Sequence, residues 1–346
     1  MAGVGWLPRP IKLLTNNILQ KDEPDHRRLR KLVDAAFARR DVLAMRGDVE
    51  IIADRIIDGF AGWDEVDLVG AFALQLPLEV ICDLVGLPEE DRATFSAFAQ
   101  RSLSINNTLD LFLAVGAFNK LLDHTRGQIE AARRSPRPGL IGELVPAEEA
   151  GDRLDEGELL SMIVLLLLAR FETTRNLIAD SVLALERHPE QKAWLLADPA
   201  ARMEPAVEEL ARFTSPVQST KPRYVARDAE FFGAQLRRGE VILALVAAAN
   251  ADPAAFDHPE ELRLDRFPNP HLVFSSGIHF CLGMQLARVE AQSALGRLYA
   301  RFPALALARP DRVEWIKRVG IRGPVSLPVR LTTRMQTSST LPSETK

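Results

Sequence analysis

From residue 25 to residue 215, hydrophobic side chains recur mostly at spacings of three and four residues, a periodicity that predicts helices. The predicted helices cover about 25–37, 67–85, a segment that begins near 89, 109–132 and 155–187. The last of these is longer than most helices of globular proteins, and its Met162–Leu168 stretch is apolar on nearly every side. Such a helix is typical of the centre of a large domain.

After Pro216 the pattern changes toward alternation, which predicts strands. Tyr224–Phe232 and Val241–Val246, with Gly233 as a turn, are expected to form a hairpin-like sheet. An irregular, proline-rich segment follows, then a helix from Met284 and a strand within 325–331. The chain therefore has the pattern of a mainly α domain with a small β region.

Composition sets limits on the function. The chain has 346 residues and is 47% hydrophobic, which is ample for a large core. Its net charge of −4 gives no general reason to expect nucleic acid or an anionic membrane as a partner. The longest apolar run, Leu159–Ala169, is too short to cross a bilayer, which takes about 20 residues. With two distant cysteines and no N-terminal signal, we expect a cytoplasmic monomer.

The candidate chemistry lies in the segment Phe274–Gly283, directly before the predicted helix at Met284. Cys281 is expected among unpaired N–H groups at the positive end of that helix, which favours its thiolate form. A single thiolate without neighbouring Cys, Asp or Glu is a poor zinc or iron–sulfur site. It suits haem, whose ring supplies four nitrogens and needs one protein ligand. The alternative is a buried, inert thiol.

The other residues of this loop also suit a haem site. Gly277 can turn the chain sharply, and Gly283 leaves room for a flat cofactor. His279 can reach a propionate, while Phe274 and Phe280 keep water from the sulfur.

The spacing F-x-x-G-x-H-x-C-x-G closely resembles the cysteine-ligand loop of the haem-thiolate monooxygenases, the cytochrome P-450 (P450) family. Ser275 departs from that pattern, since the family usually has glycine there. The resemblance covers roughly residues 20–331 and implies haem b between the long central helix and the loop, with Cys281 as the axial iron ligand. The domains it implies are an irregular segment 1–21, a monooxygenase domain 22–331 and a disordered tail 332–346.

Other residues match the family's cofactor contacts. His26 and Arg30 share one helix face, and their H-x-x-x-R pattern resembles the family's propionate site. Arg223 precedes the first strand where the family has another propionate-binding arginine, and Ala169 lies where its central helix faces the haem. The nearby basic residues Arg27, Arg28 and Lys31 are expected to receive an acidic electron donor such as ferredoxin, which acts with its reductase.

The central helix carries Ala169-Arg170-Phe171-Glu172-Thr173. The resemblance implies that Glu172 and Thr173 are catalytic residues that deliver protons for oxygen activation. From the residues alone, Thr173 can instead bond to a carbonyl of its own helix, with Glu172 and Arg170 as surface charges. Arg170 replaces the family's glycine. Its side chain can turn away, bind a substrate carboxylate or block oxygen activation.

Glu209 and Arg212 lie three residues apart on one predicted helix face, before a Ser-Pro pair. The resemblance implies that they form a buried network with Arg266. The turn 321–324 resembles the family's last substrate-contacting turn.

The family also has another helix and paired strands before the basic helix, whereas only about twenty residues precede it here. The strands at 224–246 are therefore expected to lack partners and to expose an edge. Either the chain is truncated or it closes the gap in another way.

The resemblance implies a monooxygenase that inserts one oxygen atom from O2 into a small organic substrate. Two alternatives stay open: a peroxide-driven peroxygenase in which Arg170 holds a carboxylate substrate, and a haem-binding protein without oxidase activity. The sequence does not identify the substrate.

Overall fold

The computed structural model of the chain describes residues 17–38, 42–103, 108–149 and 154–331. The α-helices are α2 (Asp25–Ala38), α3 (Arg46–Asp58), α4 (Gln75–Val85), α5 (Glu89–Leu103), α6 (Thr108–Arg134), α7 (Leu140–Glu149), α8 (Glu156–Arg187), α9 (Pro189–Ala197), α10 (Pro199–Thr214), α11 (Val246–Ala249) and α12 (Met284–Arg301). Short 3-10 turns form at Ile18–Gln20 and Gly277–His279, and a π-helical turn at Val69–Ala73. The strands are β1 (Glu65–Asp67), β2 (Arg223–Tyr224), β3 (Ala229–Phe231), β4 (Ala234–Leu236), β5 (Val241–Ile242), β6 (Ala306–Leu307) and β7 (Pro328–Arg330).

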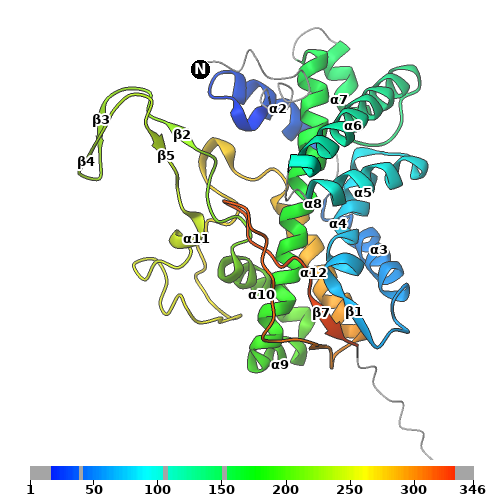
Figure 1. Cartoon of the computed structure of the whole chain (residues 1–346), viewed down its shortest axis with the longest axis vertical. Coiled ribbons are helices and arrows are strands. Elements are labelled where there is room, and N and C mark those ends of the chain that lie inside the picture. The colour runs from blue at the N-terminus through cyan, green and yellow to red at the C-terminus, as the bar shows by residue number, and fades with distance from the viewer. Residues whose placement is uncertain (1–16, 39–41, 104–107, 150–153, 332–346) are drawn as a thin grey trace, which may run out of the picture.

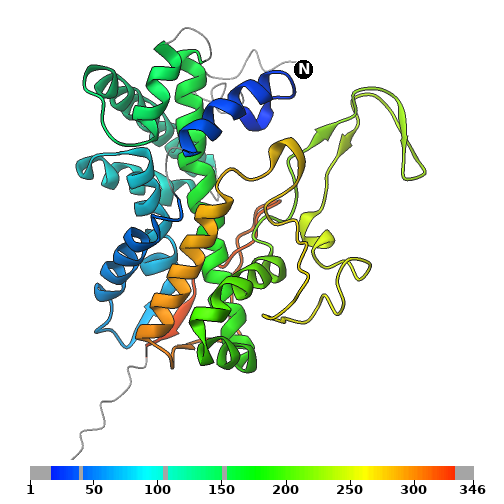
Figure 2. The same ribbon diagram turned by 180° about the vertical axis from the view of Figure 1, so that it is seen from behind.

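Helix α8 runs through the middle of the helical body (Figures 1 and 2) and packs against α4, α6, α10 and α12. Its start is fixed by a capping box. The Asp155 side chain accepts a hydrogen bond from the backbone N–H of Glu158 at 2.7 Å, and the Glu158 side chain accepts one from the N–H of Asp155 at 3.2 Å. Residues 159–164 and 174–185 of the helix are buried, so the predicted central helix is confirmed.

Three antiparallel strands, in the order β1-β7-β6, form a small sheet beside the helices, with Val66 opposite Val329 in its core. The remaining strands form two separate two-stranded ladders, β2 with β5 and β3 with β4. Both ladders keep one register about the turn at Gly233, with Tyr224 opposite Val241 and Phe231 opposite Ala234, so they are two parts of the single hairpin that was predicted. Gly233, with φ of +77°, turns the chain as expected, but the second strand is shorter than predicted, because Val246 begins a helix instead of ending a strand.

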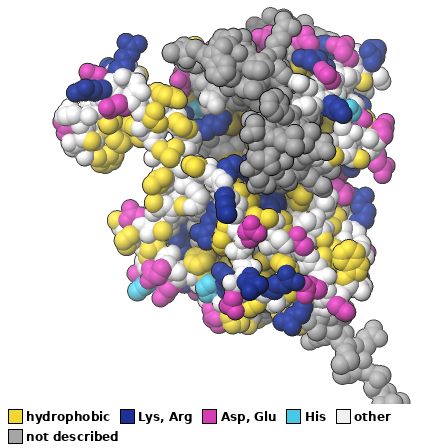
Figure 3. Space-filling model, in the orientation of Figure 1, with side chains coloured by type: hydrophobic (Ala, Val, Ile, Leu, Met, Phe, Trp, Pro, Cys, Tyr) yellow, Lys and Arg dark blue, Asp and Glu magenta, His cyan; other side chains and the backbone are white. Residues whose placement is uncertain are grey.

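The segment 223–242, which we call the arm, projects from the helical body (Figures 1 and 2). Within the described part of the chain its strands have no partners outside the arm, as expected for the exposed edge. Tyr224 is 72% exposed and Phe232 is 96% exposed, and Figure 3 shows hydrophobic side chains along the arm. A large apolar surface here is open to solvent.

The mainly helical fold with a small β region is confirmed. Within the described residues, no helix combines the length and apolar character needed to span a bilayer. The predicted tail 332–346 and most of the segment 1–21 lie outside the described residues, and the domain boundaries stay predictions.

Candidate functional site

A cavity of about 240 Å³ lies between the central helix and the cysteine loop. It gathers residues from five separate parts of the chain, namely 18–37, Ile81, 162–177, 216–217 and 273–287. Those predicted from the sequence that line it are His26 and Arg30 of α2, Ala169, Arg170 and Thr173 of α8, and Phe274, His279, Cys281 and Gly283 of the loop. The rest of the wall is mainly apolar, including Phe37, Ile81, Met162, Leu165, Leu166, Leu177, Val217 and Val273.

The loop owes its shape to a tight turn before α12. Ser275 and Gly277 both have positive φ, +63° and +73°, and the N–H of Cys281 donates to the carbonyl of Phe274 at 2.9 Å. Ser275 adopts this conformation at a cost that glycine would not bear. The result is that the side chain of Cys281 is exposed to the cavity.

The electrostatic setting of Cys281 differs from the expectation of a lowered pKa. Burial by the surrounding protein raises the pKa of this thiol above its ordinary value, against the opposing effects of the Gly283 N–H and the positive charges of Arg170, Arg30 and Arg288. The helix N-terminus alone therefore does not produce the thiolate. A metal ion does so by coordination, because binding deprotonates a thiol.

Nitrogen donors gather around His279. The rings of His26 and His279 meet edge to face, 4.4 Å between centroids, and Arg30 donates from Nη1 to the carbonyl of Phe280 at 2.6 Å. Nε2 of His279 is buried with no hydrogen-bond partner in the part of the chain that the structure describes. Burial lowers the pKa of both histidines, and the charge of Arg30 adds to this at His26. Arg223 is not among the residues that line the cavity, but its positive charge also acts on His279.

On α8, Thr173 lines the cavity and Glu172 does not. The hydroxyl of Thr173 donates to the carbonyl of Ala169 at 3.1 Å, the bond within the helix that residue chemistry alone predicts. Glu172 forms an ion pair with Arg318, a residue of the C-terminal segment. The two predicted catalytic residues thus face different surroundings.

Arg170, the residue in place of the family's glycine, forms an ion pair with Glu290 of α12. The Arg170 side chain is 9% exposed and that of Glu290 is 0% exposed. Burial raises the pKa of the Glu290 carboxyl, and the charge of Arg170 opposes this. Sequence reasoning missed Glu290 and Arg318. The signal for Glu290 was an acidic residue between Val289 and Ala291 in a predicted helix.

Glu209, Arg212 and Arg266 come together in the interior. Glu209 accepts hydrogen bonds from Arg212 at 2.7 and 2.8 Å and from Arg266 at 3.0 and 3.1 Å. The two guanidinium groups also donate to carbonyls of the irregular segment, among them those of Asn250 and Asp257. This network ties α10 to the segment that leads into the cysteine loop.

The turn at 321–324 packs closely on α8. A Cβ atom on Gly323 would lie 2.3 Å from the side-chain amide of Asn176, so no larger residue fits without displacement. Arg175 donates to the carbonyl of Pro324 at 2.7 Å. The turn is held firmly, although it is not among the residues that line the cavity.

The basic residues of α2 differ in their partners. Arg28 donates to both carboxylate oxygens of Glu158, at 2.5 and 3.1 Å, and so ties α2 to α8. Arg27 pairs with Glu23 in the turn that precedes α2. Lys31 is exposed.

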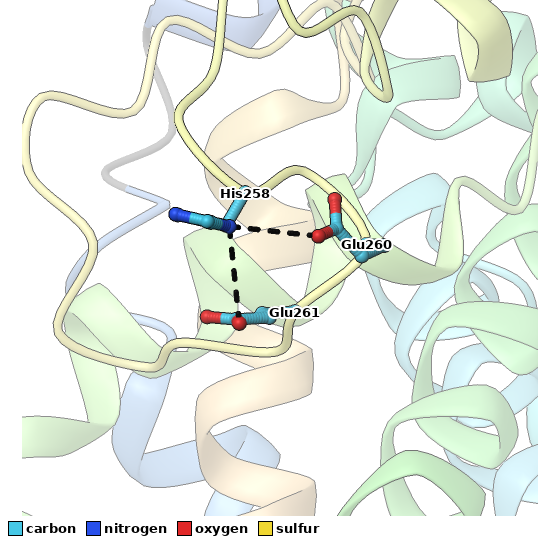
Figure 4. Close-up of side chains that lie close together, drawn as sticks. All are labelled: His258, Glu260 and Glu261. Carbon is cyan, nitrogen blue, oxygen red and sulfur yellow. Dashed lines mark ion pairs between the residues drawn. The ribbon is translucent and has the colours of Figure 1, made fainter.

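Figure 4 shows a separate group of potential metal ligands, His258, Glu260 and Glu261. Nδ1 of His258 lies 3.6 Å from Glu260 and 4.0 Å from Glu261. All three side chains are exposed, and the His258 side chain is 58% exposed. Exposed acidic clusters are common without a metal, so we assign none here.

The donor set of the cavity fits haem. One sulfur faces an otherwise apolar space, as a ring that already carries four nitrogens requires. At one part of the wall, the imidazoles of His26 and His279 and the guanidinium of Arg30 are available to bind propionates. A propionate there would give Nε2 of His279 a hydrogen-bond partner.

The chain is similar to known proteins over nearly all of its length. The sequence profile described as Cytochrome P450 matches residues 203–312. The chain is 40% identical over 322 residues to the polyketide biosynthesis cytochrome P450 PksS of Bacillus subtilis (strain 168), covering 93% of this chain and 79% of the relative. It is 39% identical over 326 residues to the vitamin D(3) 25-hydroxylase of Pseudonocardia autotrophica, covering 94% and 78%.

Solved structures agree. The structure of PksS from Bacillus subtilis 168 superposes with a TM-score of 0.88 at 39% identity, covering 94% of this chain and 84% of that one. The structure of P450BioI in complex with an acyl carrier protein carrying hexadec-9-enoic acid superposes with a TM-score of 0.86 at 34% identity, covering 93% and 84%. With this identity over more than three quarters of its relatives, the chain belongs to the cytochrome P450 family.

Proposed function

We propose that this enzyme is a haem-thiolate monooxygenase that inserts one atom of O2 into an apolar organic substrate, using electrons from a ferredoxin-type donor. The observation that carries the proposal is the exposure of Cys281 to a largely apolar cavity whose wall also holds His26, Arg30 and His279. Several relatives are hydroxylases, which supports the same reaction type.

Proteins of this family bind haem b through a cysteine thiolate, and the bound haem supplies the oxygen-activating chemistry. In this chain Cys281 would be the iron ligand. His26, Arg30 and His279 would hold the propionates, and Arg223 would add positive charge from outside the cavity wall. Phe274, the buried first residue of the loop, lines the cavity and would limit the access of water to the sulfur.

Thr173 would supply protons to the reaction from its place in the cavity wall. Its hydroxyl now donates within α8, and rotation about χ1 frees it to donate toward the cavity. Glu172 lies one residue before it and outside the cavity wall, held by Arg318. Because neighbouring helix residues do not face each other, a water molecule would have to carry a proton from Glu172, outside the cavity wall, to Thr173 within it.

The substrate would be apolar, since aliphatic and aromatic side chains dominate the cavity wall. The relatives support this class. One is named a vitamin D(3) 25-hydroxylase, one a mycinamicin IV hydroxylase/epoxidase, and one solved structure, CYP267B1, contains myristic acid. A carboxylate held by Arg170 is less well supported, because Glu290 already engages that guanidinium.

The test is turnover under isotopically labelled oxygen. Holoenzyme would be supplied with a ferredoxin, its reductase and NADPH, and with myristic acid or vitamin D3 as the probe. We expect a product carrying one labelled oxygen atom by mass spectrometry. Product formed only with hydrogen peroxide would favour the peroxygenase, and spectral binding shifts without product under either supply would favour a haem protein that does not oxidise.

The variant T173V tests the proton route, because valine keeps the shape of threonine but lacks the hydroxyl. We expect the yield of product per NADPH to fall roughly tenfold or more, with hydrogen peroxide released in its place. The matched variant T173S keeps the hydroxyl and should keep most of the product yield per NADPH. Equal yields per NADPH in T173V and T173S would contradict a proton-transfer role for Thr173.

A further inference from the structure

Arg170 and Glu290 join two helices at the wall of the cavity. Arg170 lies in the middle of α8 and Glu290 in the first half of α12, and the two helices pack together. Both side chains are almost completely buried. Either charge alone in this position would be strongly disfavoured, so each depends on the other.

The guanidinium of Arg170 also faces the cysteine loop. Its Nη1 lies 3.6 Å from the point where a Cβ atom on Gly283 would be, two residues after Cys281. Arg170 and Cys281 line the same cavity. The guanidinium of Arg170 therefore lies close to the loop that carries the cysteine ligand.

The hydrogen bonding of the Arg170–Glu290 ion pair is incomplete. Nε of Arg170 and Oε2 of Glu290 are both buried without a hydrogen-bond partner among the residues that the structure describes. A buried pair with unmet groups contributes little to stability compared with two apolar residues of the same size. The position of the charge, and not the strength of the pair, is therefore the feature to explain.

We propose that Arg170 is a positioning residue whose guanidinium, held in place by Glu290, presents a fixed positive charge to the cysteine ligand and raises the reduction potential of the iron. A positive charge near the sulfur stabilises the state that has gained an electron. This inference rests on the proposed function, because it takes Cys281 as the haem ligand.

A purely structural pair makes a different prediction. If the pair only joined α8 to α12, R170M and E290Q would both loosen the site and would shift the potential in the same direction. If the charge acts on the sulfur, R170M removes the positive charge, after which the buried Glu290 takes up a proton, whereas E290Q removes only the negative charge and leaves Arg170 without its counter-charge. The two variants should then move the potential in opposite directions.

The experiment is a spectroelectrochemical titration of the substrate-free holoproteins. At a fixed applied potential we expect R170M to hold roughly tenfold less reduced haem than the unsubstituted protein, equivalent to a downward shift of about 59 mV. E290Q should shift upward, and R170K, which keeps the charge, should stay closer to the unsubstituted protein than R170M does. R187M removes an arginine of α8 that does not line the cavity and should leave the potential unchanged.

Shifts of R170M and E290Q in the same direction, or an unshifted R170M, would overturn the inference. If R170M does not fold, R170K and E290Q still decide the matter, because a downward shift of E290Q contradicts the proposal. Failure of the proposed function appears separately: the unsubstituted protein would then lack the spectrum of a thiolate-ligated haem before any variant is compared.

Discussion

Asp180 lies in the second half of α8 and is only 3% exposed. Neither of its carboxylate oxygens has a hydrogen-bond partner within the described residues. Burial raises the pKa of Asp180 to about 8, against the opposing charges of Arg322 and Arg175. The folded protein thus holds a proton that the unfolded chain releases near the ordinary value of 3.8.

The consequence is a loss of stability with rising pH. The folded form binds the Asp180 proton more tightly, so this contribution is complete below about pH 4 and is lost progressively up to about pH 8. We predict that D180N removes this part of the decline in the free energy of unfolding. The free energy of unfolding of D180N minus that of the unsubstituted protein should therefore increase between pH 5 and about pH 8. Chemical denaturation at several pH values measures both free energies.

E156Q, in the exposed first turn of the same helix, controls for the loss of one carboxylate. Parallel stability profiles of D180N and the unsubstituted protein across this range would show that Asp180 is charged in the folded state.

At the scale of single residues, the sequence indicated the residues of the cysteine loop well, because these residues lie close together in the sequence. His26, Arg30 and His279 were also named in advance, and the structure brings them together around one cavity. Glu290 and Arg318 were not, because each acts through a partner more than a hundred positions away. No periodicity links such pairs.

Among the elements, the long helices were predictable, whereas α7 and α9 were not assigned and the helix expected over 67–85 begins only at Gln75, after β1 and a π-helical turn. Helix α8 has a continuous apolar pattern and a capping residue at its start. The ladders β2–β5 and β3–β4 have only two or three residues in each strand. The partner of the apolar run at Val241 was predicted correctly, but the strands are shorter than that run indicated, and Val246 already belongs to α11.

The basic residues of helix α2 offer a test of where the electron donor binds. Arg27, Arg28 and Lys31 were predicted to receive an electron donor, but Arg28 is bonded to Glu158 of α8 whereas Lys31 is exposed. We predict that K31E slows reduction by ferredoxin roughly tenfold at low ionic strength, and that the difference shrinks as salt screens the charges. Stopped-flow reduction at increasing salt measures this.

R28Q is the matched comparison on the same helix. It should lower stability by releasing α2 from α8, with a smaller effect on the salt dependence of reduction. If ferredoxin reduces both variants at the same rate as the unsubstituted protein at low salt, the donor docks elsewhere.

For the molecule as a whole, the order of helices and the position of the loop were enough to predict the fold. Helix α2, the long helix α8 and the cysteine loop surround one cavity, although these parts of the chain are far apart in sequence. The apolar wall could not be predicted, because its residues come from many elements and share no pattern. Identity of the substrate depends on that wall.

The most direct measurement is the absorption spectrum of the reduced, carbon-monoxide-bound protein, recorded for the unsubstituted chain and for C281S. The account predicts a strongly red-shifted band, typical of thiolate ligation, in the unsubstituted protein, and its loss in C281S because serine supplies no thiolate. An unsubstituted protein without haem, or a C281S variant with the same haem content and the same band, would contradict the assignment of Cys281 as the iron ligand.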